Sequence, residues 1–179
     1  MTQSVISFEE LRNKDVAIVG GKNASLGEMI SQLKAKGVRV PTGFATTADA
    51  FNEFLTQDQL GKRIEQELED LDINDVVKLA QSGKKIRKWI LDTPFSSDFE
   101  DSIKNHYESL IKRSPKGTTF AVRSSATAED LPDASFAGQQ ESFLNIHGLE
   151  NIRQAIREVF ASLYNDRAIS YRVHKNFIH

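Results

Sequence analysis

Two β-like runs flank a loop of small and polar residues in the last third of the chain, and this pattern constrains the fold most. The runs span residues 119–122 and 142–146 and are rich in β-branched or aromatic residues. Much of the remaining sequence has apolar residues at the three-to-four-residue spacing of helices. We therefore expect an α+β fold, helix-rich with about six or more helices, and a small, mainly antiparallel sheet containing residues 119–123 and 142–146.

Helical patterns extend from residue 23 to residue 113. Residues 23–36 predict a helix that Gly37 ends, with an inward face formed by Leu26, Met29, Ile30 and Leu33. Two capping boxes predict later helix starts, Thr46 with Asp49 and Ser97 with Glu100. Residues 16–19, followed by Gly20 and Gly21, predict a brief strand or an extended entry to a turn. Further helices are expected from residue 152 to 163 and from Asp166 onward.

Length, charge and cysteine content exclude several classes of protein. The 179 residues fit one domain, or one domain built of two small lobes. The net charge of -2 predicts no general attraction to nucleic acids or acidic membranes. The absence of cysteine excludes disulfides and thiol nucleophiles, which fits a cytoplasmic protein. No stretch approaches the roughly 20 apolar residues of a membrane span, and the N-terminus lacks the pattern of a signal peptide.

The first candidate binding motif is Gly20-Gly21-Lys22 at the start of a predicted helix. It is not a P-loop, because Val16 stands where the first glycine belongs and Asn23 replaces the Ser or Thr that would hold magnesium. Flexible glycines, a lysine and a helix amino end nevertheless suit a phosphate group. The alternative is a helix-start turn with an exposed lysine.

The second candidate is Arg123, a cation where the first β-like run meets the loop. Arginine beside a loop of small residues suits an anionic ligand, phosphate above all. Several hydroxyl groups nearby can bond phosphate oxygens: Ser124, Ser125, Thr127, Ser135 and Ser142. The alternative is a surface salt bridge.

Neither the acidic residues nor the histidines of the sequence predict a metal site. Glu129, Asp130, Asp133 and Glu141 lie in or beside the loop, where acids are more often solvated than coordinating. None of the four histidines lies near an obvious second ligand.

Four segments carry a resemblance to a known family. Residues 19–29 (VGGKNASLGEM), 40–47 (VPTGFATT), 120–145 and 163–172 closely resemble the N-terminal nucleotide-binding region of phosphoenolpyruvate synthases, the pyruvate, water dikinases. The resemblance spans nearly the full chain, and the match over residues 120–145 is highly specific. Rifampin phosphotransferases, pyruvate phosphate dikinases and glucan, water dikinases share the region in varying degree.

The resemblance implies an ATP-grasp fold, of which residues 1–179 would be the N-terminal part and the first lobe. It implies that ATP donates its β-phosphate to a histidine on an absent domain, leaving AMP and phosphate, and that the phosphoryl group then reaches pyruvate. Lys22 and Arg123 would hold ATP phosphates, and residues 128–137 would form a flap over the nucleotide. Gly138, Gln139, Gln140 and Ser142 would line the phosphate side. The ligands of Mg²⁺ are expected in a C-terminal part that the chain lacks.

The resemblance therefore predicts an ATP-binding fragment of a much longer dikinase, with no catalytic residue of its own and no turnover in isolation. Lys22 and Arg123 are expected to converge, and residues 127–138 are expected to be the most mobile internal segment without nucleotide. Two alternatives stay open: the corresponding region of a rifampin phosphotransferase, and a non-catalytic, stand-alone nucleotide-binding or regulatory module. The sequence leaves the oligomeric state open.

Overall fold

The computed structural model describes residues 3–127, 130–131, 134–135 and 141–174. The chain divides into two compact units. Unit 1 comprises Met1–Asn52, Ser96–Thr118 and Ser125–Ser135, and unit 2 comprises Glu53–Phe95, Thr119–Ser124 and Phe136–His179.

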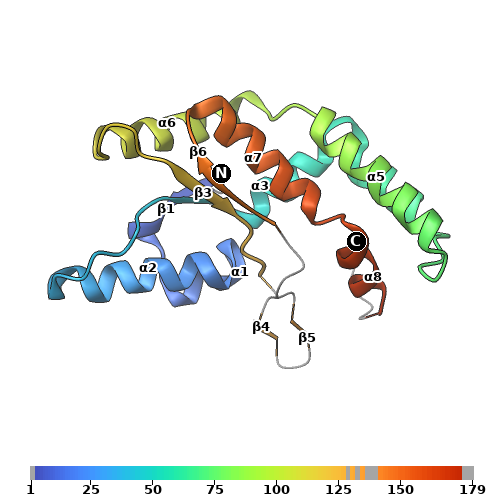
Figure 1. The fold of residues 1–179 in the computed structure, drawn as a ribbon, viewed down its shortest axis with the longest axis horizontal. Coiled ribbons are helices and arrows are strands. Elements are labelled where there is room, and N and C mark those ends of the chain that lie inside the picture. The colour runs from blue at the N-terminus through green and yellow to red at the C-terminus, as the bar shows by residue number, and fades with distance from the viewer. Residues whose placement is uncertain (1–2, 128–129, 132–133, 136–140, 175–179) are drawn as a thin grey trace. The chain divides into compact units, whose positions relative to one another are not determined.

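The described residues form helices and short strands in an α+β arrangement, which confirms the predicted class (Figure 1). The α-helices are α1 Val16–Val19, α2 Gly21–Leu33, α3 Ala48–Thr56, α4 Leu60–Leu68, α5 Val76–Asp92, α6 Ser97–Lys112, α7 Leu149–Ser162 and α8 Asp166–His174. Short 3-10 turns are η1 Phe8–Glu10, η2 Asn13–Asp15, η3 Lys34–Lys36 and η4 Gln57–Gln59. The strands are β1 Val5–Ser7, β2 Phe44–Thr46, β3 Phe120–Arg123, β4 Asp130–Leu131, β5 Ala134–Ser135 and β6 Ser142–Ile146. In the described part of the chain, no helix is long and apolar enough to span a bilayer.

The strands pair as three separate two-stranded sheets, β1–β2, β3–β6 and β4–β5, each antiparallel. The pairing of β3 with β6 confirms the sheet expected from the two β-like runs. The sequence did not predict β1, whose partner lies about forty positions along the chain. It also did not predict the β4–β5 ladder, which lies within the segment expected to form a flap.

Unit 1 is built around a small apolar cluster formed by Leu11, Val19, Ala24 and Ala45. Helix α6 packs against β1, and α2 packs against η1 and η2. Gly27 lies so close to Leu11 that a Cβ placed on it would be 2.5 Å from the Leu11 Cβ. The missing side chain of Gly27 therefore lets the α2 backbone approach the segment before it.

Two predictions about this unit were wrong, the second of them in part. Residues 16–19 form helix α1 instead of a strand, because a four-residue apolar run fits either structure and the turn at Gly20 follows both. The predicted inward face of α2 is correct at Ile30, which is buried, but Leu26 and Leu33 are only half-buried and Met29 is 41% exposed. The other buried residues of α2 are the small Ala24 and Gly27. The close backbone contact at Gly27 rotates the helix toward its small residues.

Both predicted helix caps are displaced by one residue. The Thr47 hydroxyl, not that of Thr46, accepts from the backbone N–H of Ala50 at 3.2 Å. The Ser96 hydroxyl, not that of Ser97, accepts from the N–H of Phe99 at 3.4 Å and caps α6. In each case two neighbouring residues have a hydroxyl that could cap the helix, and the backbone conformation places the first helical turn after one of them. Gly37 does end the first long helical segment, in the left-handed conformation with φ 77°.

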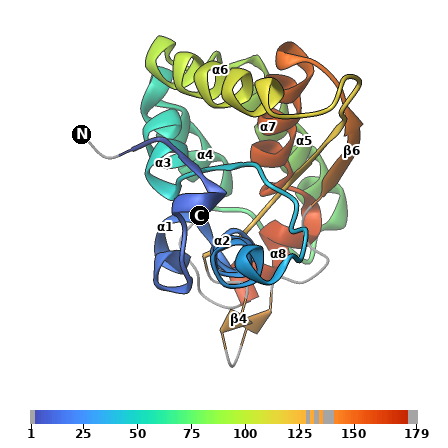
Figure 2. The ribbon, with the colours of Figure 1, turned by 90° about the vertical axis from the view of Figure 1, so that its left-hand side faces the viewer.

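Unit 2 places α7 against β3 and β6, and α5 lies alongside α7 (Figure 2). Its core includes a triangle of rings, Phe54, Phe95 and Phe160, whose centroids are 5.5 to 5.9 Å apart. Helix α8 is tied to α5 by Arg87, which donates to the carbonyl oxygen of Tyr164 at 2.7 Å and to Asp166 Oδ1 at 3.3 Å. Arg87 therefore joins α5 to α8 within unit 2.

The β3–β6 ladder contains an irregularity. Phe120 pairs with Ile146 and Val122 with Phe143, so two residues of β6 oppose the single Ala121 of β3. Asn145, one of these two residues, has φ 58°. Asparagine tolerates this left-handed conformation better than most residues, and such a bulge bends and twists a strand.

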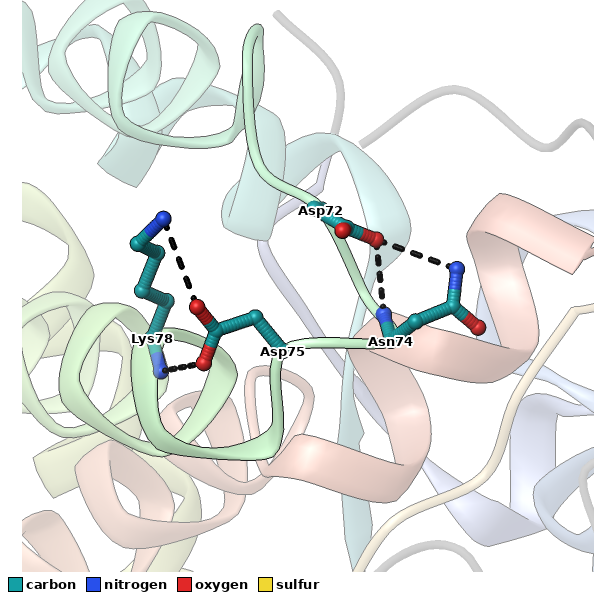
Figure 3. A network of polar contacts seen from close by, with 4 residues as sticks. All are labelled: Asp72, Asn74, Asp75 and Lys78. Carbon is teal, nitrogen blue, oxygen red and sulfur yellow. Dashed lines mark hydrogen bonds and ion pairs between the residues drawn. The ribbon is translucent and has the colours of Figure 1, made fainter.

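Helix α5 begins with a local polar network (Figure 3). The Asp75 carboxylate accepts from the backbone N–H of Lys78 at 3.1 Å, and Asp72 accepts from both nitrogens of Asn74. The bond from Lys78 holds the pKa of Asp75 below its ordinary value of 3.8. Val76, the first residue of the helix after this cap, is 72% exposed.

Candidate functional site

Gly20 forms a sharp junction between α1 and α2, the two blue helices of Figure 1. Its N–H donates to the Val16 carbonyl at 2.8 Å and ends α1, and its own carbonyl accepts from Ala24 at 3.1 Å in α2. Its dihedral angles are φ 79° and ψ 163°, in a region that is open in practice only to glycine. The motif residue Gly20 is therefore required by the backbone itself.

The start of α2 is bonded to the segment that follows β3. The N–H of Gly21 donates to the carbonyl of Ala126 at 3.2 Å, and the N–H of Asn23 donates to Ser125 Oγ at 3.2 Å. A Cβ on Gly20 would overlap the Ser125 backbone and hydroxyl. The two sequence motifs, predicted independently, thus meet in unit 1 through these residues.

Lys22 is the second residue of α2 and is half-buried. Its neighbours Gly21 and Asn23 are both bonded to the segment after β3, as described above. Further along the helix, Glu28 accepts from the backbone N–H of Asn13 at 3.2 Å, and this bond lowers the pKa of Glu28. The amino end of α2 is therefore held by bonds from other residues of unit 1.

Arg123 and Ser142 face each other across the β3–β6 ladder of unit 2. Arg123 is the last residue of β3, Ser142 is the first residue of β6, and the two are register partners. Both residues are exposed, whereas Ser124, the next residue after Arg123, is 8% exposed. The register therefore places a guanidinium and a hydroxyl at adjacent, accessible positions.

The other predicted site residues have different outcomes. Gly138, Gln139 and Gln140 lie outside the described residues, as does most of the predicted flap. Lys22 belongs to unit 1, and Arg123 and Ser142 belong to unit 2, so the convergence of Lys22 with Arg123 stays a prediction. Ser125, considered in the sequence as a hydroxyl for phosphate, accepts from the backbone N–H of Asn23, and its contact with phosphate stays a prediction.

Within the described residues, no group of three or more His, Cys, Asp or Glu side chains could hold a metal ion. Glu141, His147 and His174 are exposed. His106 is half-buried beside Phe44, and its Nδ1 lies 2.8 Å from the Ser102 carbonyl oxygen. His106 therefore serves the packing of unit 1.

Unit 2 also contains a groove of about 350 Å³ between α4 and α5, and none of the predicted site residues lines it. At its edge, Glu67 accepts from Lys85 Nζ at 2.5 Å and from the Ser82 hydroxyl at 2.9 Å. The hydrogen bond from Lys85 holds the pKa of Glu67 below its ordinary value of 4.5. These bonds join α4 to α5, so we interpret the groove as structural.

The sequence was compared with known proteins. Residues 16–179 match the family described as "Pyruvate phosphate dikinase, AMP/ATP-binding domain". The chain is 61% identical over 176 residues to a protein of Neisseria meningitidis serogroup B named "Phosphoenolpyruvate synthase", covering 98% of this chain and 22% of the relative. Proteins of the same name from Escherichia coli K12 and Synechocystis are 56% and 49% identical, over 98% and 99% of this chain and 22% of each relative. The chain thus spans about a fifth of the length of these relatives.

Proposed function

The chain belongs to the family of the pyruvate phosphate dikinase AMP/ATP-binding domain, and we propose that it is the first ATP-binding lobe of a phosphoenolpyruvate synthase. The observation that carries this proposal is the 61% identity to a relative of that name across 98% of the chain. The names of the relatives favour this function over a rifampin phosphotransferase or a stand-alone module. An ATP-grasp fold, completed by a second lobe, is part of the proposal.

The task we assign to this chain is to bind and orient the ATP phosphates. The planar guanidinium of Arg123 can donate two bonds to phosphate oxygens, and the Ser142 hydroxyl beside it can donate a third. Lys22 would add a point charge at the amino end of α2, where the helix dipole is positive. Gly138, Gln139 and Gln140 complete the proposed set.

The remaining steps are assigned to parts of the longer protein. The proposal places the histidine that accepts the β-phosphate, the pyruvate site and the Mg²⁺ ligands there. The described residues of this chain hold no group of three or more acids or histidines suited to a metal ion, so they do not fit Mg²⁺.

A titration followed by two-dimensional NMR tests the binding role, because it detects weak complexes of a 20.1 kDa chain. Millimolar ATP should shift amide signals at residues 20–23 and 123–125. Arg123→Ala removes a charge-assisted bond of about 1.5–3 kcal/mol, so the dissociation constant should rise about 10- to 150-fold. Arg167→Ala, at an exposed arginine of α8 in the same unit, is the matched control and should leave binding unchanged. Equal binding by Arg123→Ala and the wild type would refute the assignment.

Turnover is tested in a longer protein. We would exchange the corresponding region of the Neisseria relative for this chain and measure AMP release that depends on pyruvate. The exchange should preserve activity, and Arg123→Ala should lower it. The 179-residue chain alone should release no AMP from ATP and pyruvate, so pyruvate-dependent release by that chain would contradict the division of roles.

A further inference from the structure

Helix α2 receives its amino-terminal cap from a distant part of the chain. A helix normally begins at a residue whose side-chain oxygen accepts from the second or third N–H of the helix. Gly20 occupies that position and has no side chain. Ser125 Oγ accepts instead from the N–H of Asn23, the third residue of α2, at 3.2 Å.

The close approach of Ser125 depends on Gly20. A Cβ at Gly20 would overlap the backbone and the hydroxyl of Ser125. Gly148, which begins α7, has the same φ of 79° and a ψ of 155°, yet nothing lies within 4 Å of a Cβ placed there. The two glycines therefore share a backbone conformation. A Cβ at Gly20 would clash with Ser125, whereas a Cβ at Gly148 would clash with none of the described residues.

The contacts with residues 125 and 126 lie on both sides of Lys22. Gly21, before Lys22, donates to Ala126, and Asn23, after it, donates to Ser125. On the inner side, the neighbouring Ala24 is fully buried in the apolar cluster of unit 1. The backbone that carries the Lys22 ammonium is consequently fixed from several directions.

We propose that Ser125 is a positioning residue for Lys22: its hydroxyl holds the first turn of α2 so that the Lys22 side chain starts from a fixed backbone when it meets the phosphates of a nucleoside triphosphate. This inference rests on the proposed function for its ligand. A hydroxyl that accepts from Asn23 keeps a proton to donate, so direct contact of Ser125 with phosphate is the competing explanation. The two explanations differ in whether the effect of Ser125 passes through Lys22.

The first test needs no ligand. Hydrogen exchange of the Asn23 amide, measured by NMR in ATP-free protein, should accelerate about 2- to 30-fold in Ser125→Ala, which corresponds to the usual loss of a helix cap. Gly20→Ala should accelerate the same amide, and Gly148→Ala should not. Amides of α5 and α7 should keep their wild-type exchange in Ser125→Ala, which confirms that the protein stays folded. Unchanged exchange at Asn23 in Ser125→Ala would overturn the proposal.

The second test is a double-mutant cycle with ATP as the ligand. If Ser125 acts through Lys22, Ser125→Ala should weaken ATP binding severalfold in the wild type and little further in Lys22→Ala. Independent, additive losses would overturn the positioning role in favour of direct contact. Absence of any ATP-dependent shift in the wild-type protein would refute the proposed function and the role of Ser125 toward ATP with it. The exchange experiment would still report separately whether the cap exists.

Discussion

Replacing Phe54 by alanine removes one corner of the ring triangle in unit 2. Phe54 is 1% exposed, and its ring lies 5.5 Å from that of Phe95 and 5.6 Å from that of Phe160. Buried Phe→Ala changes cost about 3–5 kcal/mol, because apolar area is lost and a cavity remains. The two neighbouring rings also contact each other at 5.9 Å and limit collapse into the cavity, so we expect a loss of about 4 kcal/mol.

Leucine at the same position separates volume from ring geometry. Phe54→Leu keeps most of the apolar volume and loses two ring pairs of about 0.5–1.5 kcal/mol each, so its loss should be about 1–3 kcal/mol.

Urea unfolding, followed by far-ultraviolet circular dichroism and by fluorescence, measures the free energy of unfolding of these variants. Trp89, the single tryptophan, lies in α5 of the same unit, with the Arg63 guanidinium 4.4 Å from its ring centre. The control is Val77→Ala at a valine that is 61% exposed, and its change should stay within about 0.5 kcal/mol. A loss below about 2 kcal/mol for Phe54→Ala, with an unchanged urea slope, would refute the packing argument.

Two further predictions concern the cap of α6 and the response to acid. Ser96→Ala should lower the free energy of unfolding by about 1 kcal/mol, measured in the same urea assay. Ser97→Ala, at the exposed neighbour, should leave it nearly unchanged. A larger loss in Ser97→Ala than in Ser96→Ala would contradict the observed cap. The pKa of Glu67 is lowered in the folded state from an ordinary value of 4.5, mainly by the hydrogen bond from Lys85, so its stabilising contribution is complete above about pH 4.5 and is lost as the pH falls through the folded pKa. In Glu67→Gln the stability should therefore fall less steeply below that pH, and an identical acid profile would argue against the contribution.

The long helices and the β3–β6 pair could be predicted from the sequence because their signals are local and repeated. Helix α7, expected from residue 152 to 163, spans Leu149–Ser162 and buries Ile152, Ile156 and Phe160 at helical spacing. Strands β3 and β6 could be predicted because β-branched and aromatic residues are concentrated in both and a loop of small, polar residues separates them. Strand β1 has only three residues, and it becomes a strand through its pairing with β2.

The candidate site was harder to predict, because its organising contacts are between residues far apart in the sequence. The motif around Lys22 and the segment after Arg123 were both identified from the sequence. The role of Ser125 as a helix cap could not be predicted from the sequence. A serine that follows a strand has the same local sequence pattern whether its hydroxyl contacts a ligand, water or another helix. A glycine at a helix start is not a sufficient signal either, because Gly148 begins α7 in the same conformation and no described residue lies within 4 Å of a Cβ placed there.

The distance along the chain between Asn23 and Ser125 has a consequence for biosynthesis. The two residues are 102 positions apart. At about 5–20 residues per second, the ribosome needs about 5–20 s to proceed from one to the other. During that interval α1 and α2 can form with Leu11 and Ala45 as neighbours, but the amide of Asn23 has only water to bond. The lysine-bearing turn is therefore among the last parts of unit 1 to be completed on a nascent chain, and a chain that ends before Ser125 would contain a helix α2 without this cap.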